Sequence, residues 1–169
     1  MRTNASRVLE PMPTIPPHEM LAAELADDDE PLAELRRAIE ADEMPPFYSN
    51  QPVVKDAAAG QVVHPIALYM DGVAFQRQDS VLGVWCYHLF SSRRHLIAVV
   101  RRSEMCNCGC RGWCTLYPLL NMVAWSLTSM VAGLWPAARH DGMPWDEKDS
   151  DRQDKGAVPF GWKAVCVSC

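Results

Sequence analysis

The chain has 169 residues, which is enough for one domain with a hydrophobic core and a tail. Its net charge of −5 is unevenly spread, with −7 in residues 1–60, +3 in residues 61–115 and −1 in residues 116–169. Seven cysteines are an odd number, and the first 17 residues lack the apolar segment of a secretory signal, so a secreted, disulfide-based protein is not expected.

The N-terminal third is predicted to be a tail rather than part of a sheet. Residues 1–17 contain four prolines and little hydrophobic periodicity, which predicts disorder. Residues 18–44 are rich in Ala, Leu and Glu and predict helix, broken into two pieces at Pro31. We therefore divide residues 1–60 into a disordered segment, 1–17, and an acidic helical segment with its linker, 18–60. The apolar stripe of residues 18–44 packs on its own domain or on a partner protein.

Residues 61–169 predict four strands and one long helix. The apolar run from residue 61 ends at Asp71-Gly72 and reads as a strand followed by a turn. Residues 80–90 and 95–102 are two more short strands, joined by a gap the size of a hairpin turn. A helix over 115–132, a polar loop over 138–157 and a last strand over 161–169 complete the order β-β-β-α-β. This order predicts an α+β fold that resembles the opening half of a ribonuclease-H-like domain.

The predicted helix needs a comparison with a membrane span. No charged residue lies between Gly112 and Pro136, and residues 115–135 are about long enough to cross a bilayer. Pro118, Asn121 and Thr128 fall near one side of the helical wheel, however, and leave an apolar face elsewhere. We favour a buried helix and keep a single-pass membrane protein as the weaker alternative.

Two motifs point to a family. The segments CGCRGWCTLYP (108–118) and RHDG (139–142), followed by Trp145, resemble an uncharacterised family from large, repeat-rich eukaryotic genomes. Those proteins are similar to fragments of transposon-encoded DDE-type transposases, whose catalytic domain is ribonuclease-H-like. The resemblance covers about residues 64–162 and implies a nuclear, DNA-related protein.

The resemblance also implies a catalytic acid. Asp71 would be the first of several carboxylates that hold Mg²⁺ for nucleotidyl transfer. In similar sequences the last strand is followed by Gly-Asp-Trp, whereas this chain ends in VCVSC. We therefore expect a truncated domain that is catalytically inactive as this chain.

A cysteine cluster gives the strongest local signal. The candidate zinc ligands are Cys106, Cys108, Cys110, Cys114 and His140. Their spacing is tighter than in most structural zinc sites, and Gly109 and Gly112 would help the backbone to wrap around a metal. A closing ligand could also come from the pair Cys166 and Cys169. The alternatives are reduced thiols packed at a bend, and a redox role at a helix N-terminus.

The middle of the chain carries a candidate nucleic-acid contact. The basic residues are Arg93, Arg94, Arg101, Arg102 and Arg111. Together with Trp113 and Tyr117 they would hold phosphates and stack a base. The alternative is that these arginines are simply solvated. His95, at a strand start, is expected to be structural rather than catalytic.

Three functions remain open on the sequence alone. The first is an incomplete transposase-derived domain that is nucleic-acid-related by ancestry and not an active enzyme. The second is a zinc-stabilised, non-enzymatic interaction module with residues 18–44 as its partner surface. The third is the membrane protein built on residues 115–135. The first two predict an intracellular location.

Overall fold

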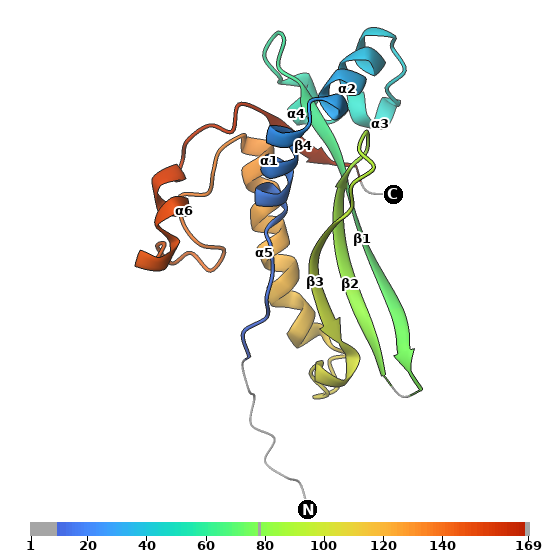
Figure 1. Cartoon of the computed structure of the whole chain (residues 1–169), viewed down its shortest axis with the longest axis vertical. Helices are drawn as coiled ribbons and strands as arrows, with labels where there is room; N and C mark the ends of the chain where they lie inside the picture. The colour runs from blue at the N-terminus through green and yellow to red at the C-terminus, as the bar shows by residue number, and fades with distance from the viewer. Residues whose placement is uncertain (1–9, 78, 168–169) are drawn as a thin grey trace, which may run out of the picture.

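The computed structural model describes residues 10–77 and 79–167, and Figure 1 shows their arrangement. The N-terminal helices are α1 (Pro17–Asp27), α2 (Glu30–Glu40), α3 (Pro46–Ser49) and α4 (Pro52–Lys55). The strands are β1 (Val63–Gln76), β2 (Asp79–His88), β3 (His95–Arg101) and β4 (Lys163–Cys166). The remaining helices are η1 (Arg102–Glu104), α5 (Trp113–Ala132), η2 (Glu147–Asp149) and α6 (Ser150–Lys155).

The four strands form one mixed sheet in the order β3-β2-β1-β4. β1, β2 and β3 are an antiparallel meander, while β4 runs parallel to β1. α5 connects β3 to β4, as a parallel pair requires a crossover. The α+β class and the predicted order of three strands, a helix and a fourth strand are thus confirmed.

β1 is longer than the sequence suggested. Asp71 and Gly72 lie inside the strand and pair with Gly83 and Leu82 of β2. The prediction of a turn at these two residues is wrong, because the chain stays extended as far as Gln76. An Asp-Gly pair is a turn signal only when no neighbouring strand continues the hydrogen-bond ladder.

The core lies between the sheet and α5. Ile66, Val84 and Val100, from three different strands, face Met122 and Met130 on α5. α5 ends at Gly133, whose φ of 74° is the left-handed conformation typical of a helix C-terminus. None of the helices in residues 10–77 and 79–167 combines the length and apolar character needed to cross a bilayer.

α1 is part of this core. Leu21 is 1% exposed and packs in the same cluster as α5 and the sheet, and α1 lies beside α5 in Figure 1. The expected helical tail is therefore integrated into the domain, because its apolar side is buried against α5. The predicted disorder of residues 1–9 lies outside the described residues, while the Ile15 N–H donates to the Ile97 carbonyl at 3.2 Å.

Among residues 10–77 and 79–167, helices cover the opposite face of the sheet only at one end. There Tyr48 of α3 packs against Val63 and Val165, and its hydroxyl donates to the Val63 carbonyl at 2.6 Å. The other end, where β1, β2 and β3 extend beyond α3 and α4, carries no helix in Figure 1.

Candidate metal centre

The cysteine segment forms a tight loop between η1 and α5. Three of its residues have positive φ angles: Gly109 (95°), Arg111 (55°) and Gly112 (85°). Left-handed residues so close together turn the chain back on itself. The Cys106 N–H donates to the Thr115 hydroxyl at 2.9 Å, which fastens the start of the loop to the first turn of α5.

This loop brings four thiols together. The sulfur atoms of Cys106, Cys108, Cys110 and Cys114 all lie within 4.8 Å of one another. The Cys108 and Cys114 sulfurs are 3.8 Å apart. Sulfurs bound tetrahedrally to one zinc ion at about 2.3 Å are separated by about 3.8 Å. The four thiols can therefore hold a metal ion such as zinc with little movement.

The electrostatics at the helix start favour a thiolate. The Cys114 N–H, at the N-terminus of α5, donates to the Cys110 sulfur at 3.3 Å and lowers the pKa of that thiol to about 6. The pKa of Cys114 rises to about 11, because its thiol is hydrogen-bonded to Cys110. Metal binding requires the thiolate form, so Cys110 is the ligand best prepared for a metal.

The other predicted zinc ligands lie elsewhere. His140 contacts Trp125, which is twelve residues or about 18 Å along α5 from Trp113. Cys166 lies in β4, which pairs with the start of β1, and Cys169 is outside the described residues. The proposed role of His140 in this site is therefore corrected, because α5 separates it from the cysteine loop.

Asp71 is not part of a comparable group. Leu68 packs in the core beside α5, and side chains alternate along a strand, so the exposed Asp71 faces away from α5. Within the described part of the chain, only the four cysteines form a group of three or more potential metal ligands. Asp71 does not belong to this group.

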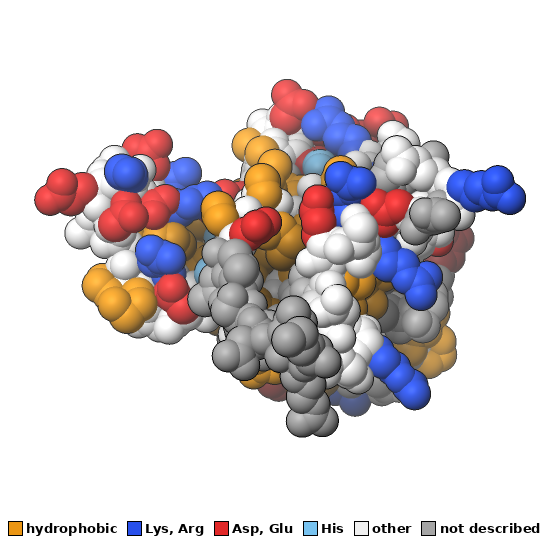
Figure 2. Space-filling view, turned by 90° about the horizontal axis from the view of Figure 1, so that it is seen from below, with side chains coloured by type: hydrophobic (Ala, Val, Ile, Leu, Met, Phe, Trp, Pro, Cys, Tyr) orange, Lys and Arg blue, Asp and Glu red, His pale blue; other side chains and the backbone are white. Residues whose placement is uncertain are grey.

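The predicted arginine cluster is divided between two places. Arg93 and Arg94 precede β3, while Arg101 and Arg102 follow about 20 Å further on at its other end. Arg93 forms an ion pair with Asp27 at 2.8 Å, and Arg101 pairs with Asp79 at 2.9 Å. In the view of Figure 2, Lys and Arg side chains are scattered rather than gathered into one patch.

A buried carboxylate is the first feature that the sequence did not indicate. Glu24 of α1 accepts hydrogen bonds from the Ser91 hydroxyl and from His95 Nε2, the latter at 2.5 Å. Its side chain has no exposed surface. His95 is thus structural, as predicted, and holds α1 against the start of β3.

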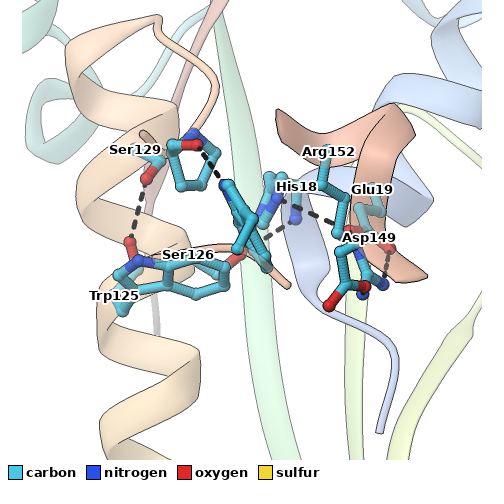
Figure 3. Close-up of polar contacts among 9 residues, drawn as sticks. His18, Glu19, Trp125, Ser126, Ser129, Asp149 and Arg152 are labelled. Carbon is cyan, nitrogen blue, oxygen red and sulfur yellow. Dashed lines mark hydrogen bonds and ion pairs between the residues drawn. The ribbon is translucent and has the colours of Figure 1, made fainter. Parts of the chain in front are cut away.

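A serine–histidine contact is the second such feature, and Figure 3 shows it between α1 and α5. The His18 N–H donates to the Ser126 hydroxyl at 2.9 Å, and that hydroxyl lies 2.8 Å from His18 Nδ1. The hydroxyl has one hydrogen to donate and two acceptor lone pairs, so it serves the backbone N–H and the ring nitrogen of His18 at the same time. Ser126 is 0% exposed, so this pair is a structural joint and not a nucleophile.

A salt bridge also connects α1 to the lobe that contains η2 and α6. Arg152 binds both carboxylate oxygens of Glu19, at 2.6 and 3.0 Å, and one oxygen of Asp149 at 2.7 Å. Trp145 Nε1 donates to the Pro136 carbonyl at 3.2 Å. The polar loop predicted over residues 138–157 is thereby attached to α1, and Figures 2 and 3 show the mixed charges of this lobe and its link to α1.

A third buried contact joins two histidines on neighbouring strands. His64 Nδ1 and His88 Nε2 are 3.0 Å apart, and both residues are buried. The Phe90 N–H donates to His88 Nδ1, so His88 carries its hydrogen on Nε2 and donates it to His64. Burial lowers the pKa of His64 to about 3 and that of His88 to about 4.

No protein-family model, curated protein or solved structure matches this chain.

Proposed function

We propose that this chain is a non-enzymatic binding domain in which a zinc ion fixes the loop between β3 and α5. The observation that carries this proposal is the approach of four cysteine sulfurs within 4.8 Å. The ligand set of four thiolates suits a structural zinc ion, because no position is left open for a substrate or water. The loop would then be held by the metal rather than by a hydrophobic core.

Metal analysis of the purified chain tests this proposal. We expect one zinc ion per chain after purification under reducing conditions, and loss of that zinc in the variant Cys110→Ser. The matched control is Cys166→Ser, which removes a cysteine of similar burial outside the loop and should keep the zinc. A chain that purifies without metal, or a Cys110→Ser variant that keeps stoichiometric zinc, would contradict the proposal.

We also infer that the fold is ribonuclease-H-like and of transposase descent. The order β3-β2-β1-β4, with a helical crossover between the parallel strands, supports this inference. That the domain is catalytically inactive as this chain remains a prediction. A nuclear location and an ancestral role in DNA transfer follow from this proposal and remain predictions.

The parallel register gives this ancestry a sharp test. Val63 pairs with Lys163 and Ile66 with Cys166, so a continued β4 would place the partner of Asp71 two residues after Cys169. The genomic sequence downstream of the last codon is expected to encode an acidic residue at that position. Finding no acidic residue near that position, in any reading frame, would contradict the proposed transposase ancestry. The zinc proposal would not be affected by that result.

A further inference from the structure

The uncovered end of the sheet presents an open face, defined by Tyr69, Val73, Trp85, Tyr87 and Val99, and the exposed carboxylate Asp71 lies on the same face between Tyr69 and Val73. These residues alternate with core residues such as Leu68, Val84 and Ala98, and therefore point away from α5. Tyr69 is 41% exposed, Val73 52% and Val99 45%. An apolar and aromatic surface of this kind on a sheet usually has a partner.

Two aromatic rings of the open face are stacked on each other, and a third meets them edge-on. Tyr69 and Trp85 are opposite each other on β1 and β2, with ring centroids 4.9 Å apart and an interplanar angle of 8°. The Trp85 ring covers Gly83, where an added Cβ would lie 1.9 Å from it. Glycine at this position therefore lets the Trp85 ring lie over the strand.

A cation adjoins these rings. The Arg94 guanidinium lies 4.0 Å from the centroid of Tyr87, whose ring is 6.0 Å from that of Tyr69. Arg94 Nη1 donates to the carbonyls of Ser91 and Arg93, and no carboxylate in residues 10–77 or 79–167 forms an ion pair with this arginine. It remains available to an anion. The surrounding residues 61–115 carry a charge of +3 within an acidic chain.

We propose that the open face binds single-stranded nucleic acid. Bases would stack on the Tyr69–Trp85 pair, and a phosphate would contact Arg94. Stacking on exposed aromatic rings beside a cation is a sequence-tolerant way to hold unpaired bases. A duplex would not bind in this way, because its bases are already stacked on one another. This inference goes beyond the zinc centre and does not depend on it.

Fluorescence anisotropy with a labelled 12-nucleotide strand of mixed sequence, as DNA and as RNA, tests the proposal. We expect saturable binding at low salt that also quenches tryptophan fluorescence, and a much weaker response to the matching duplex. Tyr69→Ala should weaken binding about tenfold, within the range for loss of one stacked base. Arg94→Gln should weaken it as well and reduce the dependence of the affinity on salt.

The matched control is Tyr117→Ala on α5. Tyr117 is 55% exposed and contacts Trp113, so it offers an alternative stacking site of similar exposure. We expect this variant to bind like the unchanged chain, and circular dichroism should show that all three variants are folded.

Three results would overturn the proposal. The first is no binding at protein concentrations up to about 100 μM, the weak end of sequence-independent binding to nucleic acid. The second is binding that Tyr117→Ala weakens and Tyr69→Ala does not. The third is a self-associating chain that Tyr69→Ala converts to monomer while oligonucleotides have no effect, which would assign the open face to a second copy.

Discussion

Glu24 is a carboxylate inside the molecule, where both of its oxygens have partners. Ser91 and His95 donate to it, and both partners belong to the turn and strand that follow β2. Removing one member of a buried polar network leaves the others without partners in a place that water does not reach. This residue therefore fixes the position of α1 on the sheet.

We predict that Glu24→Ala lowers the free energy of unfolding by about 3 kcal/mol, the usual cost of breaking a buried pair. The control is Glu34→Ala on α2, where the glutamate side chain is 42% exposed and pairs with Arg37. Urea unfolding measures both variants. An equal effect of the two substitutions would show that the Glu24 contacts contribute nothing specific.

At the scale of secondary-structure elements, the joint between α1 and α5 depends on one hydroxyl. Ser126 serves both the backbone N–H and the ring of His18, and it is completely buried. Ser129, one turn later, bonds only to the Trp125 carbonyl of its own helix. The two serines differ in role although they are three residues apart, and Figure 3 shows both.

We predict that Ser126→Ala costs about 2 kcal/mol of unfolding free energy, because it leaves two polar groups of His18 without a partner. Ser129→Ala should have little effect, since alanine favours helix more than serine. Thermal unfolding of the two variants compares them directly. If both variants have the melting temperature of the unchanged chain, Ser126 does not hold α1 against α5.

The elements also show what sequence could predict. Apolar runs of β-branched residues located the strands of the meander, and the uncharged stretch after Gly112 located α5. The true length of β1 was missed, because its second half is held by the ladder to β2 rather than by an apolar pattern. The surface on which α1 docks could not be predicted, since the partners of His18 and Glu24 are more than 60 residues away.

The same limit applies to the sites. Close spacing indicated the four cysteines, because a short loop brings them together whatever the rest of the chain does. His140 could be excluded from the cysteine site only once the path of α5 was known. Likewise, the strand register was needed to show on which face of the sheet Tyr69 and Asp71 lie. Residues within one loop can be grouped from sequence, whereas those joined by tertiary packing cannot.

At the scale of the whole molecule, three buried histidines make stability depend on pH. Burial lowers the pKa of His18, His64 and His88 to about 4, 3 and 4. The unfolded chain therefore takes up more protons than the folded chain below about pH 6.5, and stability falls as the pH drops. The contribution of these histidines to stability is fully present above the pKa that they have in the unfolded chain.

We expect the free energy of unfolding to be lower at pH 5 than at pH 7, by about 2 kcal/mol for each buried histidine. His18→Asn should reduce this difference, and His140→Asn, at an exposed position, should preserve it. Urea unfolding at both pH values provides the comparison. A difference that His18→Asn leaves unchanged would assign the pH dependence to other groups.

The central claim is that one zinc ion, held by four thiolates, fixes the loop that leads into α5. X-ray absorption spectroscopy at the zinc edge of the purified chain tests it most directly, because it identifies the ligand atoms and their distances. We predict four sulfur neighbours at about 2.3 Å. A first shell dominated by nitrogen or oxygen, or fewer than three sulfur neighbours, would contradict the account.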